Sequence, residues 1–212
     1  MVDKYQEDLM ILKNRLLSKD LVTVNLEGNF DGKGKQYMVD LFKKGMPVIP
    51  SYDNPDDVKD SYLEYIIKLP VSYSSFGQIT VSKDELKNHF KDGLIIQPKI
   101  DFISEVQFYY VGNDFQYALS YTPCKYPLYP KPIKYIPTEE ELDNANMFAN
   151  LSGLKVGVQR IDFLRKPDGK LILLEVEDTS PNLSLYELDI ETKNLFLNNY
   201  KLNIYNYLKE RD

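Results

Sequence analysis

The sequence predicts an α+β protein in which a small α+β lobe, residues 21–92, precedes a larger lobe with an antiparallel sheet, residues 93–212. Strand-like runs separated by glycine- and proline-containing turns follow one another after residue 93. Apolar residues recur at helical spacing before, between and after these runs. The chain has 212 residues, 43% of them hydrophobic, and can therefore bury a sizeable core.

The chain opens with apolar side chains at helical spacing over residues 3–18, opposite a charged face, which predicts an amphipathic helix. We interpret residues 1–20 as this helix, a remnant or linker of a preceding domain. The small lobe is then expected to begin with a strand at 21–25, a glycine-rich loop at 28–35 and a helix at 37–42 that Gly45 ends. Apolar segments follow at 46–50 and 65–68. The lobe is expected to close with a hydroxyl-rich loop at 71–78, a strand at 79–81 and a helix from a Ser82 cap to Gly93.

The larger lobe is expected to be built on strands joined by turns such as Gly112-Asn113-Asp114 and Pro167-Asp168-Gly169. The expected strands cover residues 94–97, 105–111, 115–121, 159–164 and 171–176. Five prolines in residues 123–137 predict an irregular connection without helix or strand. Thr138 and the acidic residues after it predict a helix to about residue 152, and apolar spacing predicts a closing helix at 192–209.

Composition excludes several classes of protein. The formal net charge is −6, and the charges are spread along the chain, which disfavours nucleic-acid binding. The single cysteine, Cys124, allows neither an internal disulfide nor a zinc site of several thiolates, and we interpret it as a spectator. The single histidine, His89, is expected on the surface, so carboxylates and lysines remain as catalytic groups. Without a leader-like or membrane-spanning apolar run, the sequence predicts a cytoplasmic protein with no membrane contact.

The sharpest local signal is a hairpin rich in carboxylates. Arg160 and Asp162 alternate on one expected strand, and Glu175 and Glu177 alternate on the next, so each pair shares a face. Such charges on a packed face are costly unless a divalent cation with oxygen ligands neutralises them, and Mg²⁺ combines carboxylates with phosphate oxygens. The alternative is that the four residues lie on a solvent face and form ordinary cross-strand ion pairs. Spacing alone does not decide between the two.

Two weaker signals also favour a phosphorylated ligand. Lys68 ends an apolar strand, from which an ammonium can reach a phosphate, and the alternative is simple exposure at a strand end. Residues 71–78 contain serines and Gly77, whose backbone N–H groups can close over phosphates, although a mobile surface loop is equally consistent. The run lacks the glycine-lysine-serine spacing of a P-loop, which disfavours that class of nucleotide-binding protein.

Taken in order, these segments resemble the ATP-grasp superfamily, especially its glutathione synthetase-like and ribosomal-protein-modifying ligases, with a looser likeness to D-alanine–D-alanine ligase. The resemblance covers roughly residues 25–190. It is carried by Asn25, Asn29 and Lys35 ahead of Gly-Met-Pro-Val-Ile-Pro at 45–50, by Tyr-Ile-Ile-Lys-Leu-Pro at 65–70, by Leu-Ile-Ile-Gln-Pro-Lys-Ile at 94–100, and by the carboxylate hairpin followed by Pro-Asn-Leu at 181–183. It implies an ATP-grasp fold with the nucleotide between the two lobes.

The resemblance also implies ligand roles for individual residues. Lys35, with Lys33 as the alternative, is the first phosphate-binding lysine, and Lys68 binds the α- and β-phosphates. The resemblance places Ser74 and Ser75 in the phosphate-covering loop, and Gln97, Lys99 and Ile100 at the adenine hinge. It implies that Glu105, or alternatively Asp101, binds the ribose. The implied metal ligands are Asp162, Glu175 and Glu177, to which Asp178 or Asn182 can contribute. Arg160 and Lys68 are the residues expected to act in catalysis.

Several positions depart from the family pattern. Leu69 separates Lys68 from Pro70, and the loop at 71–78 has one glycine where many relatives have several. Ser104 replaces the usual glycine before the ribose-binding residue. Glu177 occupies the place of the usual asparagine and makes the metal site more acidic.

The activity implied is that of an ATP- and Mg²⁺-dependent ligase of the carboxylate–amine or carboxylate–thiol type, which acts through an acyl phosphate. Two Mg²⁺ ions are expected, with Mn²⁺ as an alternative. The alternatives are a nucleotide-binding or regulatory module without turnover, and a small-molecule kinase on the same fold. Complete ligases have a further α/β domain before the ATP-grasp region, so we expect a fragment, or a protein in which a partner domain or a homodimer supplies the acceptor site.

Overall fold

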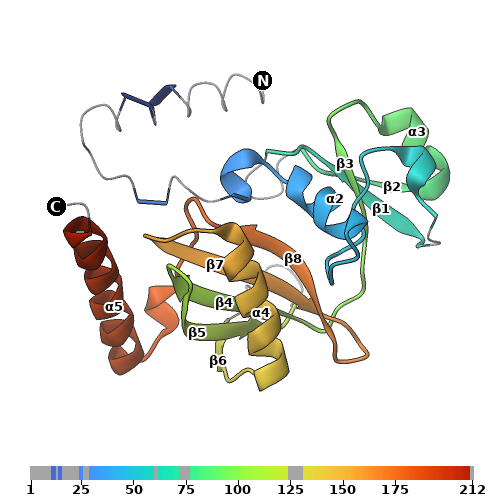
Figure 1. Ribbon diagram of the computed structural model, residues 1–212. Coiled ribbons are helices and arrows are strands. Elements are labelled where there is room, and N and C mark those ends of the chain that lie inside the picture. Colours follow the sequence, from blue (N-terminus) through green and yellow to red (C-terminus); the bar gives the residue numbers. More distant parts are fainter. Residues whose placement is uncertain are drawn as a thin grey trace.

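The computed structural model describes residues 11–12, 14–15, 24–25, 29–59, 62–71, 77–123 and 131–210. Within these residues there are two antiparallel sheets, one of three strands at the upper right of Figure 1 and one of five strands at the lower left, with helices packed beside them. The expected helix at 3–18 and strand at 21–25 fall largely outside the described residues. None of the described helices has the length and apolar character needed to cross a membrane.

The smaller sheet has the strand order β2-β1-β3, with β1 at Glu64–Lys68, β2 at Ile79–Ser82 and β3 at Ile95–Pro98. Its core contains the buried side chains of Tyr65, Ile67 and Leu86. The predicted strand at 94–97 forms as β3. It pairs with β1 of the smaller sheet, whereas the prediction placed it among the strands of the larger lobe. The predicted Ser82 cap forms a capping box with Glu85, after which a short 3-10 turn leads into helix α3, Leu86–His89. This helix ends before Gly93, because Phe90 is already extended.

The larger sheet has the strand order β6-β5-β4-β7-β8. Its strands are β4 at Ser104–Val111, β5 at Asp114–Tyr121, β6 at Ile133–Tyr135, β7 at Val158–Arg165 and β8 at Leu171–Glu177. Four of them agree with the predicted strands to within one residue at each end. Strand β6 lies in the proline-rich region for which no strand was predicted. It is short and at the sheet edge, where a neighbouring proline does not cost a ladder hydrogen bond.

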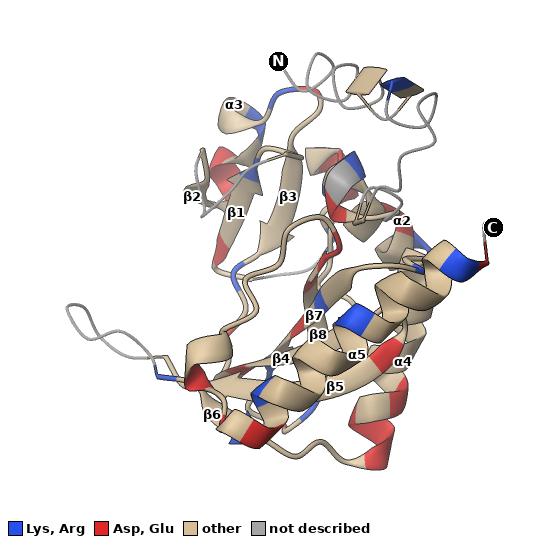
Figure 2. Cartoon of the chain, turned by 90° about the vertical axis from the view of Figure 1, so that its left-hand side faces the viewer, with Lys and Arg blue, Asp and Glu red and all other residues tan. Residues whose placement is uncertain are grey.

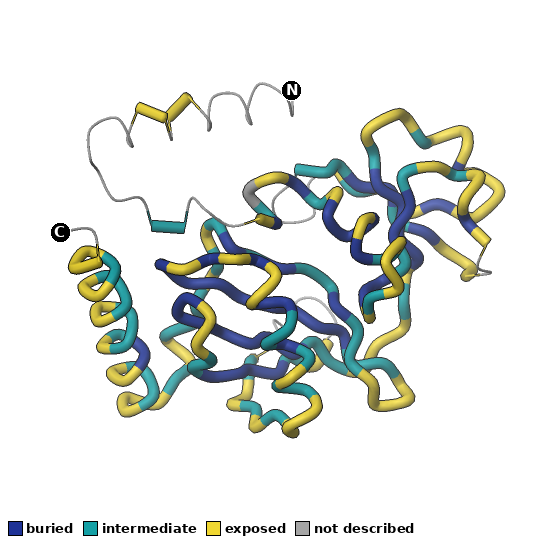
Figure 3. Tube along the Cα trace, in the orientation of Figure 1, coloured by how far each residue is buried: buried dark blue, intermediate teal, exposed yellow. Residues whose placement is uncertain are grey.

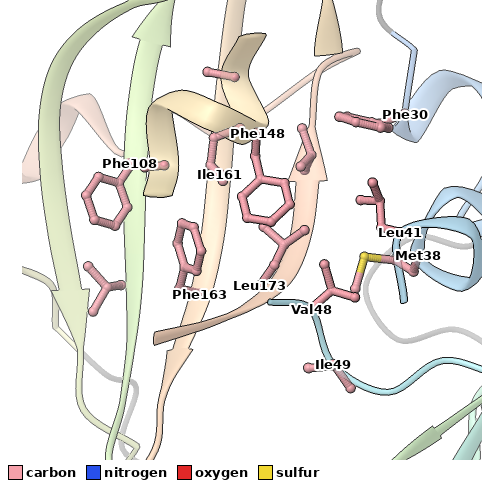
Figure 4. Packing of buried hydrophobic residues seen from close by; sticks show 14 of the residues in the cluster. Phe30, Met38, Leu41, Val48, Ile49, Phe108, Phe148, Ile161, Phe163 and Leu173 are labelled. Carbon is pink, nitrogen blue, oxygen red and sulfur yellow. The ribbon is translucent and has the colours of Figure 1, made fainter. Parts of the chain in front are cut away.

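Helices cover both faces of the larger sheet. Helix α4, Glu139–Ser152, begins at the predicted Thr138 cap, which forms a capping box with Glu141. It packs Phe148 against Phe108 and Phe163 of the sheet (Figure 4). Helix α5, Ile190–Lys209, packs on the opposite face, where it buries Phe196 against a stacked pair of tyrosines. The strands are therefore buried on both sides along much of their length (Figure 3).

The chain before the smaller sheet packs against strand β8. Helix α2, Gln36–Lys43, agrees with the prediction and places Met38 and Leu41 in the same core as Leu173 (Figure 4). Val48 forms a parallel bridge to Leu173, and the backbone N–H of Val176 donates to the Tyr37 hydroxyl at 2.8 Å. These contacts cover the outer edge of the five-stranded sheet. The lobe boundaries at 21–92 and 93–212 remain a prediction.

Candidate functional site

The carboxylate hairpin forms with its two strands in the register that the site needs. Arg160 lies opposite Glu177, and Asp162 lies opposite Glu175. The next residue of β7, Phe163, lies opposite Leu173. Leu174 is therefore an extra residue in β8 and forms a bulge. Leu173 and Val176 therefore both face the α4 side of the sheet, while the two glutamates share the other face with Asp162. Ligand oxygens of Asp162, Glu175 and Glu177 lie within 4.8 Å of one another.

Arg160 holds this cluster together. Its guanidinium donates two hydrogen bonds of 2.7 Å to the two oxygens of Asp162, one of 2.9 Å to Glu177, and one of 3.0 Å to the carbonyl of Asn182. Asp162 is only 1% exposed. Burial raises the pKa of Asp162, and the guanidinium opposes that rise. The alternative of a solvent-face ion pair is excluded, because Arg160 and Asp162 are both buried.

Two lysines approach the cluster from outside the hairpin. The ammonium of Lys35 contacts Glu175, and the backbone N–H of Lys35 donates to the Pro70 carbonyl at 2.7 Å. Gly34 lets the two segments come this close, since its φ is +86° and a Cβ there would lie 3.0 Å from the Val71 side chain. Pro70 follows the end of β1, so this contact joins the smaller sheet to the cluster.

Lys68 is the second lysine, and it is buried at the end of β1. Burial lowers its pKa to about 8, with a further contribution from the charge of Lys35, while Glu175 opposes both effects. A buried ammonium without a fully compensating anion is costly. It is therefore a ready partner for an anionic ligand such as a phosphate.

Two further carboxyl groups lie close enough to interact electrostatically with the cluster. Glu105, at the start of β4, accepts a 2.6 Å hydrogen bond from Gln107, and burial raises its pKa. Asp31 was missed by sequence reasoning, because it is a single acidic residue in a glycine-rich loop. Burial raises its pKa to about 6, with Glu175 among the charges nearby.

The site thus combines five carboxyl groups with three cationic side chains, namely Asp31, Glu105, Asp162, Glu175 and Glu177 with Lys35, Lys68 and Arg160. Figure 2 colours the acidic and basic positions along the chain. The excess of acid favours binding of a cation, and ligands that are all carboxylate oxygens suit Mg²⁺. The predicted metal ligands therefore lie together in an arrangement that fits this metal.

The predicted hinge residues lie on or next to β3. Gln97 donates to Ser51 at 2.8 Å and is buried, so its side chain ties β3 to the segment that precedes β1. The backbone N–H of Lys99 donates to the Glu64 carbonyl at 2.9 Å, and its exposed ammonium pairs with the Glu64 side chain. Ile100 packs against the core of the larger sheet. These three residues do not contact the carboxylate cluster directly.

The alternative ligands have other partners. The ammonium of Lys33 donates to Asn29 at 2.7 Å, and the side chain of Asn182 accepts from the backbone of Ser184. Asp178 is fully buried and accepts hydrogen bonds from backbone N–H groups. It is not among the three residues whose ligand oxygens lie within 4.8 Å of one another. Asp101 is exposed. The predicted loop residues Ser74 and Ser75, and Cys124, lie outside the described residues.

No family model matches the chain, and no curated protein matches its sequence. Solved structures do match. The D-cycloserine synthetase DcsG is 19% identical with a TM-score of 0.58, over 80% of this chain and 70% of that one. The ATP-grasp ligase PsnB, complexed with a phosphomimetic variant of its minimal precursor, Mg and ADP, is 17% identical with a TM-score of 0.60, over 80% and 56%.

The D-alanine–D-alanine ligase from Coxiella burnetii is 18% identical with a TM-score of 0.52, over 79% of this chain and 54% of that one. The chain therefore spans little more than half the length of PsnB and of this ligase. These proteins share the fold of this chain rather than a closely similar sequence. The chain has the ATP-grasp fold.

Proposed function

We propose that this chain binds ATP with two Mg²⁺ ions and forms the ATP-grasp part of a carboxylate–amine or carboxylate–thiol ligase. The observation that carries the proposal is the convergence of Lys35 and Lys68 on the three carboxylates of the β7–β8 hairpin. Lysines and carboxylate-held Mg²⁺ are the groups that phosphoryl transfer requires, since the charge on the transferring group must be offset. The similarity to PsnB, which was solved with Mg and ADP, supports it.

In this proposal each group has a defined task. Lys35 and Lys68 hold the phosphates, Ser74 and Ser75 cover them, and Glu105 accepts hydrogen bonds from the ribose hydroxyls. Asp162, Glu175 and Glu177 hold the magnesium ions, for which Mn²⁺ is an alternative, and the bound metal offsets phosphate charge. Arg160 fixes the orientation of Asp162 and Glu177 through the hydrogen bonds described above.

The adenine is proposed to lie against the backbone of Gln97, Lys99 and Ile100, between the two sheets. A carboxylate oxygen of the substrate attacks the γ-phosphorus, and ADP leaves. An amine or thiol then attacks the acyl carbon of the resulting acyl phosphate, and inorganic phosphate leaves. This sequence needs no histidine, in keeping with a cluster made of carboxylates and lysines. The second substrate needs a site of its own, which a partner domain or a second copy would supply.

Calorimetric titration of ATP, with and without Mg²⁺, tests the nucleotide site. We expect Mg²⁺-dependent binding that weakens at least about tenfold in Asp162→Asn and in Glu175→Gln, because each removes a charged metal ligand. Asp168→Asn is the matched control, since it makes the same isosteric change in the exposed turn of the same hairpin. Binding that is indifferent to Mg²⁺ and to all three substitutions would contradict the proposal.

Turnover is tested separately by measuring phosphate release from ATP with a panel of amino acids and dipeptides. Release that requires one member of the panel supports a ligase. Binding of ATP without release under any condition indicates a nucleotide-binding module instead. Appearance of a phosphorylated product that no amine or thiol consumes indicates a kinase.

A further inference from the structure

We propose that Asp178 is a positioning residue that holds residues 30–35, here called the Lys35 segment, against the carboxylate cluster. The inference rests on the proposed nucleotide site and adds a residue that does not itself touch ligand. Asp178 is the first residue after β8 and is 0% exposed. A buried carboxylate is retained at such a place only if donors compensate for its lost hydration.

Among the residues that the structure describes, three donors contribute to that compensation. One carboxylate oxygen of Asp178 accepts from the backbone N–H of Phe30 at 2.9 Å and from the Ser152 hydroxyl at 3.2 Å. The other oxygen accepts from the backbone N–H of Asp31 at 2.9 Å. Hydrogen bonds to an ionised acceptor are about twice as strong as neutral ones.

The two backbone donors belong to the start of a tight turn. Residues Asp31–Lys33 form a 3-10 turn whose N-cap, Phe30, supplies no side-chain hydrogen bond. Asp178 therefore caps this turn from a distant part of the chain. Gly34 and Lys35 follow directly, so the position of the turn determines where the Lys35 side chain starts.

Strand β8 and the residue after it therefore hold the Lys35 segment at two points, the turn at its start and the ammonium of Lys35. Glu175 of β8 contacts the Lys35 ammonium, and Asp178, just beyond the end of β8, holds the turn before it. The backbone N–H of Lys35 is held by Pro70 next to Lys68. With all three points in place, Lys35 is kept beside the cluster and beside the second lysine before any ligand binds. Such preorganisation improves binding because less ordering is needed.

Asp178→Asn tests this role, since it keeps the size of the side chain but turns one oxygen into an N–H donor that faces a backbone N–H. Ser152→Ala is the matched control, because it removes another donor to the same buried carboxylate and leaves the turn untouched. Titration with ATP and Mg²⁺ is expected to show binding weakened about tenfold in Asp178→Asn and by less than about twofold in Ser152→Ala. Equal effects of the two substitutions would overturn the inference.

A double-substitution cycle separates positioning from general damage. If Asp178 acts through Lys35, Asp178→Asn has no further effect on ATP affinity in the Lys35→Met background. Effects that multiply in the double variant would refute the inference while leaving the proposed function intact. Failure of the unsubstituted protein to bind ATP would instead refute the proposed function, and this inference with it.

Hydrogen exchange provides a second readout if Asp178→Asn does not fold. Coupling between Asp178 and the lysine is reciprocal, so ATP held by Lys35 should slow exchange of the Phe30 and Asp31 amides. We expect this slowing in the unsubstituted protein and in Ser152→Ala, and not in Lys35→Met. Exchange at these amides that ATP leaves unchanged would overturn the inference.

Discussion

Replacing Arg160 with methionine removes the guanidinium that compensates the most buried carboxylate of the cluster. Asp162 is 1% exposed and loses both of its 2.7 Å hydrogen bonds, while Glu177 loses one of 2.9 Å. Removing one partner of a buried ion pair costs about 3–5 kcal/mol. In a chain of this length, that loss corresponds to a fall in Tm of roughly 6–20 °C. Methionine keeps most of the apolar stem, so little of the loss comes from a cavity.

Magnesium gives this prediction a second, more specific outcome. A cation bound by Asp162 and its neighbours replaces the charge of the lost guanidinium, so millimolar Mg²⁺ should restore part of the stability of Arg160→Met. Urea denaturation followed by circular dichroism, with and without Mg²⁺, measures both effects. Arg165→Met is the control, because Arg165 lies on the same strand and pairs with Glu141 away from the cluster. The reasoning fails if Arg160→Met loses no more stability than this control, or if Mg²⁺ restores neither variant or both equally.

Two further predictions each concern one residue of the proposed nucleotide site. The pKa of Lys68 is lowered by burial to about 8, so between about pH 8 and 10.5 the unfolded chain binds a proton that the folded one lacks, and stability rises with pH. Lys68→Met should therefore be more stable than the unsubstituted protein at pH 7, by up to roughly 3 kcal/mol, and should lose most of that advantage at pH 10. Urea denaturation at both pH values checks this, and a destabilised variant at pH 7 would contradict it. The same variant should bind ATP far more weakly. If Glu105 accepts hydrogen bonds from the ribose, 2′-deoxy-ATP should bind about tenfold more weakly than ATP, and Glu105→Ala should abolish the difference. Calorimetry that finds the same preference in Glu105→Ala would refute this role.

Local signals in the chain predicted most of the elements correctly. Strands β4, β5, β7 and β8 and helices α2, α4 and α5 agree with their predicted ranges, because alternation, caps and turn residues act between near neighbours. The short strand β6 was missed since the prolines around it disfavour a strand locally, whereas its pairing with β5 depends on a distant partner. The strand at residues 95–98 was predicted but assigned to the other sheet, for the same reason.

The candidate site depends more strongly on contacts between distant residues. Asp31 carried no signal that sequence reasoning used, and Asp178 was considered only as an additional metal ligand. Each acquires its place through hydrogen bonds or charges from segments far along the chain. The contact of Lys35 with Pro70, which brings two lysines to one place, is likewise long-range. A resemblance to a family indicated which lysines to consider, and the fold determined what surrounds them.

The carboxylate hairpin shows where the two kinds of information divide. The sequence by itself determined that Arg160 and Asp162 share one face of a strand and that Glu175 and Glu177 share one face of the next, since side chains alternate with a period of two. Only the tertiary structure decided that these faces coincide. A regular hairpin continuing the Arg165–Leu171 pairing would place Asp162 opposite Leu174, and the bulge in β8 shifts the register by one residue. The shift keeps Leu173 and Val176 in the core under α4, and burial of those side chains is the physical reason that the acids meet on the other face.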